Sequence, residues 1–302
     1  MDVFRYQYGG LVLQSAAALP LAPDIDPDRP ADVTVTFGPL PIPTADCVRA
    51  KPHFQMHADG TCILRTLQGI RFLFDNGRAL RVEVPDGLDR RLVRSWLIGP
   101  GLGILLHQRG LPPLHACAVT LGERAVAIAG DSGAGKSTTA RALMQRGHRL
   151  LAEDQAVIDP VTGRVWPGAP DLRLWAEAAG AFGDPMTEDT RLEAGEDKFT
   201  IASDRLFDPR PRPLAALFVL SSDHAVERPV AERLGSAAAT ASLHRYVYRL
   251  RLATFMGATP VIFHWAAALT AGVPVFALRR PRDLSRLDEL AAHIERITEN
   301  GA

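Results

Sequence analysis

The pattern of hydrophobic and polar positions divides the chain into two parts with different periodicity. Before residue 85, hydrophobic residues alternate with polar ones in 33–37 and recur in 62–67 and 70–74, which predicts β-strands. The sequence Asp-Asn-Gly at 75–77 tolerates positive φ, and an alternating segment at 79–84 follows it. These features predict a hairpin that joins the last two strands.

A change to helical periodicity begins near residue 87. Hydrophobic residues in 88–97 have the spacing of a helix face, and those in 102–106 resume it after Gly-Pro-Gly at 99–101. We interpret these segments as a helical linker that is broken by the glycines and the proline. The predicted organisation is a β-rich lobe with its linker in 1–110 and a second domain in 111–302.

Beyond the linker, predicted strands and helices alternate, which is typical of an α/β domain. The continuous apolar run at 125–129 predicts a buried strand, followed by a helix at 137–145 and a strand at 149–152. The pattern predicts these further elements: strands at 214–220 and 273–278, helices at 237–252 and 283–297, and an exposed connection at 204–213.

Composition and charge narrow the classes of protein that fit this pattern. The 302 residues include 34 Lys and Arg and 34 Asp and Glu, so the formal net charge is zero. That balance lacks the basic excess of a general nucleic-acid binder or of a protein that binds anionic membranes. The three cysteines, Cys47, Cys62 and Cys117, are scattered without the spacing of a zinc site or a disulfide framework.

Targeting signals are not evident in the sequence. No segment reaches the roughly 18 uninterrupted apolar residues that a membrane-spanning helix needs. The first residues, Met1 to Arg5, include an early aspartate and lack the basic and apolar run of a signal peptide. We therefore expect a soluble cytoplasmic protein that binds neither nucleic acid nor membrane.

The residues from Gly130 to Ser137 fit the pattern G-x-x-x-x-G-K-[ST]. They follow a predicted strand and open a predicted helix, the context that distinguishes a phosphate-binding P-loop from an incidental glycine-rich turn. The glycines let the backbone wrap a phosphate, Lys136 reaches the outer phosphates of ATP, and Ser137 can bind Mg²⁺. The predicted nucleotide-binding residues are Gly130, Asp131, Ser132, Gly133, Ala134, Gly135, Lys136, Ser137 and Thr138.

Two adjacent acids, Glu153 and Asp154, follow the predicted strand at 149–152. The short helical crossover from the strand at 125–129 predicts that the two parallel strands lie close together, with both acids beside the phosphates. One carboxylate could then bind Mg²⁺, and the other could accept the proton of an attacking hydroxyl. The alternative is a solvated acidic strand end without a catalytic role.

His115 stands in a predicted strand at 114–119, which enters a hairpin at 121–124 and returns as the strand before the glycine-rich motif. A lone histidine is more often structural than catalytic. The residue type alone therefore leaves its role open.

These segments together resemble a known catalytic core. Leu114-His115, the run 130–137, the run 146–150 and Glu153-Asp154 are similar to the HPr serine kinase/phosphorylase family in residue type and spacing. The resemblance is specific over 112–160 and only textural afterwards. It implies a P-loop kinase core that transfers phosphate to a protein serine. The sheet of such a core is related to that of phosphoenolpyruvate carboxykinase.

Carried over by position, the resemblance assigns roles to individual residues. His115 corresponds to the family's active-site histidine, Lys136 and Ser137 to its phosphate and Mg²⁺ residues, and Glu153-Asp154 to its paired aspartates. The first acid is glutamate here, one methylene longer than the family's aspartate. We expect Glu153 near the acceptor hydroxyl and Asp154 near the metal or His115.

Two departures argue against HPr as the substrate. The second family signature, rich in Arg, Gly and Ile, is missing, and the equivalent regions at 170–175 and 195–199 have other sequences. The β-rich lobe does not resemble the N-terminal domain of those enzymes. The whole-chain pattern, including 8–11, 107–110 and 172–175, is instead similar to the HPr-kinase-like proteins of lasso-peptide biosynthetic clusters.

That subfamily resemblance implies an ATP- and Mg²⁺-dependent kinase that phosphorylates the C-terminal residue, commonly serine, of a ribosomally made precursor peptide. A flexible peptide of this kind would occupy an extended groove between the lobes. The sequence leaves a homo-oligomer open. Candidate helpers on the phosphate side are Lys198, which follows the acidic glycine loop 194–197, and Arg173, Arg245, Arg249 and Arg251.

Among these arginines, Arg245 and Arg249 lie four residues apart and so would share one helix face, for which a solvated basic surface is the favoured interpretation. Three other functions stay open: a protein-serine kinase of the HPr kinase type, a small-molecule P-loop kinase, and an ATP-binding regulator without transfer activity. A transporter-type ATPase does not fit, because its acid lies farther from the P-loop and its Leu-Ser-Gly-Gly signature is absent.

Overall fold

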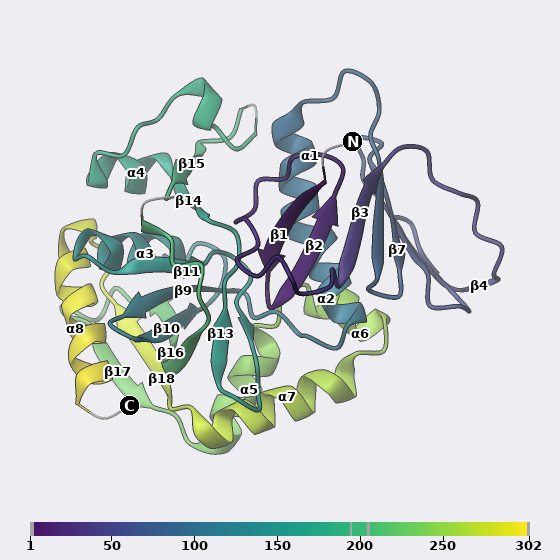
Figure 1. Cartoon of the computed structure of the whole chain (residues 1–302). Coiled ribbons are helices and arrows are strands. Elements are labelled where there is room, and N and C mark those ends of the chain that lie inside the picture. Colours follow the sequence, from purple (N-terminus) through teal and green to yellow (C-terminus); the bar gives the residue numbers. More distant parts are fainter. Residues whose placement is uncertain (1–2, 194, 204–205, 301–302) are drawn as a thin grey trace.

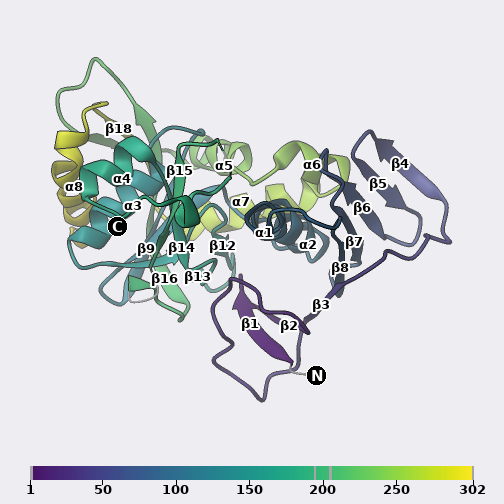
Figure 2. The same cartoon turned by 90° about the horizontal axis from the view of Figure 1, so that it is seen from above.

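The computed structural model of the protein describes residues 3–193, 195–203 and 206–300. An N-terminal lobe made of one sheet and two helices lies beside a second lobe of mixed α/β structure (Figure 1). Seen from above, helices α1 (Arg90–Trp96) and α2 (Leu102–Gln108) lie between the N-terminal sheet and the second lobe (Figure 2). Within the described ranges, no helix is long and apolar enough to cross a membrane.

The N-terminal sheet has eight strands in the order β1-β2-β3-β8-β7-β6-β5-β4. Asn76 and Gly77 have φ values of 49° and 69°, which confirms the predicted hairpin between β7 and β8. One face of this sheet packs against α2 in a core that includes Phe72, Phe74 and Leu105. The strands are β1 (Phe4–Tyr8), β2 (Leu11–Ser15), β3 (Val33–Phe37), β4 (Cys47–Lys51), β5 (Phe54–His57), β6 (Cys62–Arg65), β7 (Arg71–Asp75) and β8 (Ala79–Glu83).

The predicted break in the linker is wrong. A π-helical turn, η1 (Leu97–Gly101), joins α1 to α2 without interruption and contains Pro100. Proline removes one helical N–H, and the wider π turn accommodates it without ending the helix. The side-chain amide of Gln155 donates to the carbonyls of Ile98 and Gly99 at 2.9 and 2.8 Å, which satisfies backbone groups in this turn.

The second lobe is built on a mixed sheet. Strands β10 (Arg124–Ala129), β16 (Arg212–Ser222) and β18 (Val275–Arg280) are parallel neighbours, and β9 (Ala116–Leu121) pairs antiparallel with β10. The tight β9–β10 hairpin fills the free edge of β10, so β11 (Arg149–Ala152) pairs with β9 and lies one strand farther away than a direct crossover predicts. The remaining strands of the sheet are β12 (Val157–Ile158), β13 (Arg164–Trp166) and β17 (Val230–Arg233).

Helices cover both faces of this sheet. Helices α3 (Lys136–Gln145) and α8 (Leu287–Glu299) share a core with Val126 and Phe218, whereas α5 (Ser236–Arg245) and α7 (Thr259–Gly272) pack on the other face. The buried strand at 125–129 and the helix after the glycine-rich motif are therefore confirmed. The other elements are β14 (Asp171–Trp175), β15 (Lys198–Ala202), α4 (Ala176–Phe182), α6 (Leu250–Phe255), and the short turns η2 (Glu188–Thr190) and η4 (Leu284–Arg286).

The single helix predicted over 237–252 is wrong. The chain leaves α5 at Tyr246 and forms a turn that pairs with the strand entry carrying His115, with the His115 N–H donating to the Tyr246 carbonyl at 2.7 Å. The Tyr248 N–H donates to the Pro113 carbonyl at 2.8 Å. Arg249 then adopts a left-handed conformation, φ 53°, before α6 begins. Arg245 and Arg249 consequently do not share a helix face.

The exposed connection predicted over 204–213 is wrong in its second half. Residues 204 and 205 lie outside the described residues. Asp208 and Arg212 are buried and form an ion pair at 2.7 Å, and Arg212 already begins β16. Pairing lets these two charges sit in the interior.

Candidate active site

The glycine-rich loop, residues 130–137, connects β10 to the start of α3. Gly130, Gly133 and Gly135 have positive φ values of 153°, 81° and 99°. A Cβ on Gly130 would lie 2.5 Å from the Leu220 carbonyl oxygen, so this position cannot accept another residue without movement of the neighbouring strand. Loop N–H groups and the N-terminus of α3 meet here, an arrangement that favours the binding of an anion.

Arg280 at the end of β18 supports the loop from below. Its side chain is buried, and its Nε donates to the Ala134 carbonyl at 3.2 Å. A Cβ on Gly135 would lie 2.5 Å from Arg280 Nη2, so the loop backbone packs directly on the guanidinium. Burial lowers the pKa of Arg280, and the charge of Arg282 adds to this effect. Sequence reasoning missed this residue, although its place at the carboxyl end of a predicted strand was a usable signal.

Lys136 connects the loop to His115. Its Nζ lies 3.0 Å from His115 Nε2 and donates to the carbonyls of Gly130 and Asp131 at 3.0 and 3.1 Å. Because an ammonium group only donates, His115 Nε2 is the acceptor and Nδ1 carries the imidazole proton. That proton faces Asp154 Oδ1 at 2.9 Å. Asp154, His115 and Lys136 therefore form one hydrogen-bonded chain.

The two adjacent acids diverge because of the backbone between them. Asp154 has φ 64°, an uncommon value for a residue other than glycine, and it directs the two carboxylates toward different partners. Glu153 Oε1 accepts from Ser137 Oγ at 3.2 Å, and Glu153 Oε2 lies 3.8 Å from Arg173 Nε. Asp154 faces His115, one of its two expected neighbours. Glu153 lies on the Ser137 side, so the assignment expected from the sequence is not the one that the contacts favour.

The same environment moves the two pKa values in opposite directions. Burial raises the pKa of Glu153, and the charge of Asp154 raises it further against the opposing effect of Arg173. Burial also acts to raise the pKa of Asp154, but the hydrogen bond from His115, together with the charges of Arg173 and Lys198, outweighs it and holds the value at about 2. Asp154 is therefore ionised at neutral pH.

A cavity of about 300 Å³ collects these groups at the mouth of the loop. The two-stranded sheet β14–β15 contributes Arg173 and Lys198 to its wall, and Lys198 Nζ lies 5.7 Å from the centre of the Trp175 ring. The lysines and arginines that line the cavity outnumber its three acids, Glu153, Asp154 and Glu177, which suits a polyanionic ligand although the whole chain is neutral. The lining residues are His115, Cys117, Ser132, Gly133, Gly135, Lys136, Ser137, Thr138, Glu153, Asp154, Arg173, Leu174, Trp175, Glu177, Ala178, Lys198, Arg280, Arg282 and Leu284.

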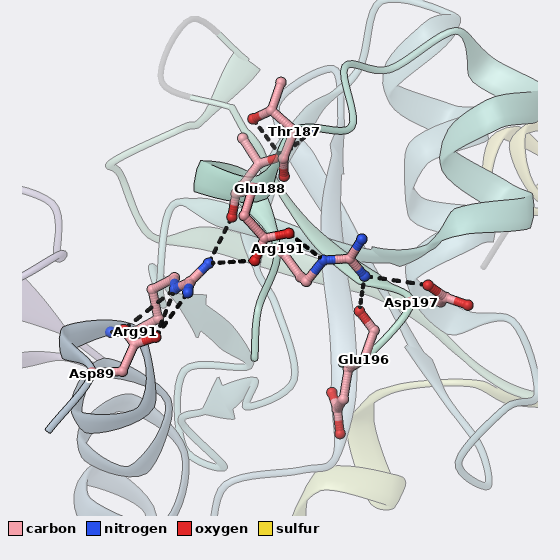
Figure 3. A network of polar contacts seen from close by, with 8 residues as sticks. Asp89, Arg91, Thr187, Glu188, Arg191, Glu196 and Asp197 are labelled. Carbon is pink, nitrogen blue, oxygen red and sulfur yellow. Dashed lines mark hydrogen bonds and ion pairs between the residues drawn. The ribbon is translucent and has the colours of Figure 1, made fainter. Parts of the chain in front are cut away.

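The segment before Lys198 is tied to α1 by a polar network (Figure 3). Arg91 donates to the Glu188 carbonyl at 2.6 Å, and Arg191 pairs with Glu188 at 2.9 Å and with Asp197 at 3.2 Å. Exposed ion pairs of this kind contribute little stability each. These contacts instead hold the start of β15, where Lys198 lies, in position. Ala194 of the predicted acidic glycine loop lies outside the described residues.

The oxygen donors beside the loop fit Mg²⁺. Ser137 Oγ and Glu153 Oε1 are hard oxygen ligands 3.2 Å apart, and Mg²⁺ is usually held by one or two such groups together with substrate phosphates. In the part of the chain that the structure describes, no three His, Cys, Asp or Glu side chains gather into a metal site. Asp154, the other expected ligand, is engaged with His115.

Two tyrosines near the acids were missed in the sequence. Tyr8 at the end of β1 is 1% exposed, its hydroxyl has no hydrogen-bond partner among the described residues, and the charge of Asp154 acts on it. The Tyr248 ring lies 5.9 Å from the His115 ring, and burial raises the pKa of Tyr248 to about 12. Tyr8 is the residue through which the N-terminal lobe approaches the two acids.

A short segment of the chain is similar in sequence to known proteins. HPr kinase/phosphorylase from Treponema pallidum (strain Nichols) is 48% identical over 50 residues, 17% of this chain and 16% of that protein. The one from Lacticaseibacillus casei is 52% identical over 42 residues, and the one from Clostridium tetani is 40% identical over 57. The segment is homologous to HPr kinase/phosphorylases. No protein-family model matches the chain.

These matches span less than a fifth of the relatives' own length, from 13% to 19% in the three proteins. Among solved structures, the HPr(Ser) kinase/phosphatase from Coxiella burnetii aligns with 63% of this chain and 99% of that chain, at 17% identity. The TM-score of this alignment is 0.33.

Proposed function

We propose that the protein is a phosphotransferase of the HPr kinase type, which transfers the γ-phosphate of ATP to a hydroxyl group of a peptide. The observation that carries the proposal is the chain Asp154–His115–Lys136 beside the glycine-rich loop. It joins a phosphate-binding cation to an ionised carboxylate within one cavity. The homology to HPr kinase/phosphorylases supports the same chemistry.

The inner side of the cavity would hold the nucleotide. The loop N–H groups and the α3 N-terminus would bind phosphate oxygens, with Lys136, Lys198 and Arg280 supplying positive charge. Ser137 and Glu153 would hold Mg²⁺, which neutralises charge on the outer phosphates when bound. When the nucleotide binds, Lys136 would exchange its hydrogen bond with His115 for one with a phosphate oxygen. That new bond would be charge-assisted.

The outer side would hold the acceptor. Its hydroxyl oxygen forms a bond to the γ-phosphorus while the bond from that phosphorus to the bridging oxygen of ADP breaks. The hydroxyl proton passes to the Asp154–His115 pair. Asp154 suits this role better than Glu153, because its side chain is 24% exposed against 5% and it is ionised.

We further propose that the acceptor is a ribosomally made precursor peptide of the lasso type, phosphorylated on its C-terminal serine. Contacts of these sequence segments support the proposal: His107 Nε2 contacts the Tyr248 carbonyl at 2.8 Å, and the Tyr248 ring lies 5.9 Å from the His115 ring. Burial raises the pKa of Tyr8, and the charge of Asp154 raises it further. His107 in the linker is thus connected through Tyr248 to the candidate catalytic histidine.

Mass spectrometry tests the proposal directly. The protein is incubated with ATP, Mg²⁺ and a synthetic peptide that ends in a free C-terminal serine, with Lys136→Ala as control. We expect a mass gain of one phosphate on the serine with the native protein and none with the variant. A parallel reaction with purified HPr shows whether the acceptor is HPr or the peptide with the C-terminal serine. Nucleotide binding without phosphorylation of either acceptor would contradict the kinase assignment and leave an ATP-binding regulator.

A further inference from the structure

A second pocket opens beside His115, outside the cavity described above. Its volume is about 290 Å³, and it lies between the glycine-rich loop and the segment that follows α5. His115 and Ser132 line both pockets, so a molecule in the second pocket lies next to the imidazole and the loop. We call it the arginine pocket, and its residues are His115, Gly130, Asp131, Ser132, Arg245, Tyr246, Val247, Tyr248 and Arg249.

The two arginines of this pocket differ in their partners. Arg245 pairs with Asp131 at 3.1 Å, and the Tyr246 side chain also contacts Asp131. Arg249 is exposed, and its guanidinium lies 5.8 Å from the Tyr248 ring centre. Across the described ranges, no carboxylate lies within ion-pair distance of Arg249. Arg249 is therefore the charge in this pocket that an anionic ligand can still neutralise.

The backbone fixes Arg249 relative to His115. Backbone hydrogen bonds join residues 246 and 248 to residues 115 and 113, at 2.7 and 2.8 Å. Arg249 follows directly, with φ 53°, a left-handed conformation that is strained for a residue other than glycine. Strain of this kind persists where surrounding contacts impose it, and here those contacts belong to the strand entry that carries the candidate catalytic histidine.

We propose that the arginine pocket is the acceptor subsite and that Arg249 binds a carboxylate which the acceptor carries close to its reacting hydroxyl. The inference rests on the proposed function and deepens it. Arginine binds carboxylates through two parallel N–H···O bonds. The nucleotide has its own cations, Lys136, Lys198 and Arg280, in the inner cavity. The carboxylate comes from a peptide C-terminus or from an acidic side chain, two sources with the same chemistry.

Equilibrium binding of three short peptides tests the inference in the presence of Mg²⁺ and a non-hydrolysable ATP analogue. The probes are N-acetyl-glycyl-serine as free acid, the same dipeptide as amide, and N-acetyl-aspartyl-serine amide. We expect the free acid to bind the native protein about tenfold or more tightly than its amide. Arg249→Gln removes this preference. The matched control Arg251→Gln keeps it, because Arg251, although a candidate helper from the sequence, is exposed on α6 and lines neither the inner cavity nor the arginine pocket.

The outcomes separate this inference from the proposed function. Tight binding of the aspartyl amide supports a side-chain carboxylate, and preference for the free acid alone supports a C-terminus. Equal affinity of the native protein for all three peptides, or no binding of any of them, overturns the inference, as does an Arg249→Gln variant that loses affinity for the ATP analogue instead. With ATP in place of the analogue, phosphorylation of all three peptides at equal kcat/KM also overturns it and leaves the proposed function standing. If the protein prefers peptides with a carboxylate but transfers no phosphate, the inference stands and the proposed function is contradicted.

Discussion

The two lobes contribute to the candidate site in different ways. The second lobe supplies the glycine-rich loop, both acids, His115 and the surrounding cations. The N-terminal lobe has a large aromatic and aliphatic core of its own, and it approaches the acids through Tyr8 at the end of one strand. Chemistry is therefore concentrated in one lobe, whereas the other provides support and a surface beside the site.

This contrast predicts that substitutions in the two lobes will have separable effects. Changes at Lys136 and His115 in the second-lobe site should lower phosphoryl transfer at nearly constant stability, whereas changes at the two acids should also alter stability. Changes in the N-terminal core should lower stability and leave nucleotide binding by the remaining folded protein unchanged. The two cores touch at β12, where Val157 packs among N-terminal lobe residues, so the lobes are separate in chemistry but continuous in packing.

The largest expected effect is that of Lys136→Ala. Its Nζ is the cation that connects the loop to His115, and loss of a positioned charge at a transferring phosphate costs about 10³-fold or more in rate. Single-turnover transfer of labelled phosphate to a serine peptide measures it, with circular dichroism to verify the fold. A variant that retains more than a tenth of the native rate would place the phosphate site elsewhere.

His115→Ala and Asp154→Asn should come next. Each breaks the chain that receives the acceptor proton, which we expect to lower transfer by about 10²- to 10⁴-fold with nucleotide affinity nearly unchanged. Calorimetric titration with ATP analogue and a transfer assay on the same samples separate the two quantities. If Glu153→Gln lowers transfer far more than Asp154→Asn does, the base is Glu153 and the assignment from the sequence is restored.

Phe72→Ala tests the other side of the comparison. Phe72 is fully buried in the N-terminal core, and its truncation should lower the free energy of unfolding by about 3–5 kcal/mol. Denaturant unfolding measures this loss, and the KM for ATP is expected to stay at its native value in the folded fraction. A KM that rises with the loss of stability would show that the N-terminal core shapes the nucleotide site.

Part of this architecture was predictable from the sequence because its signals are local. The hairpin at 75–77 needs residues that accept positive φ, and the glycine-rich loop needs glycine where a neighbouring carbonyl comes within 2.5 Å of a Cβ position. Both requirements leave their mark within a few residues. The acids at 153 and 154 were also placed beside the loop correctly, because the short crossover restricts where the next strand can run.

The features that were missed depend on contacts between distant segments. Residues 246–248 have helical neighbours in sequence, yet they pair with residues 113–115, which no local pattern records. Arg280 lies beneath the loop because β18 joins the sheet beside β16. Strand β11 pairs with β9 because β9 already occupies the edge of β10. In each of these cases, pairing between distant segments determines the structure and the local sequence pattern does not reveal it.

Substitutions of Asp154 and Glu153 should change the free energy of unfolding in different directions. The pKa of Asp154 falls from 3.8 to about 2 in the folded protein, so its ionised form stabilises the fold by about 2 kcal/mol above pH ~4. This contribution is lost as the pH falls toward 2. The pKa of Glu153 is raised by burial, so its ionised form opposes folding and acidification relieves the cost.

At pH 7, Asp154→Asn should therefore lower the free energy of unfolding by about 2 kcal/mol, whereas Glu153→Gln should leave it equal or higher. Urea unfolding of both variants from pH 7 to pH 3 measures this. The deficit of Asp154→Asn should shrink toward the acid end of the series. A Glu153→Gln variant that is less stable than Asp154→Asn at pH 7 would contradict the assignment of Asp154 as the ionised member.

The smallest effect is expected at the point where the lobes meet the site. Tyr8→Phe removes a buried hydroxyl that has no hydrogen-bond partner in the described structure, so the variant should be as stable as the native protein or more stable by up to about 1 kcal/mol. Transfer should stay within about threefold, since the ring still fills its place beside Asp154 and Arg173. Thermal unfolding and kcat at saturating peptide measure the two quantities. A drop in kcat of more than about tenfold at unchanged stability would mean that the hydroxyl acts on the acids through water, and the N-terminal lobe would then share in the chemistry as well as support it.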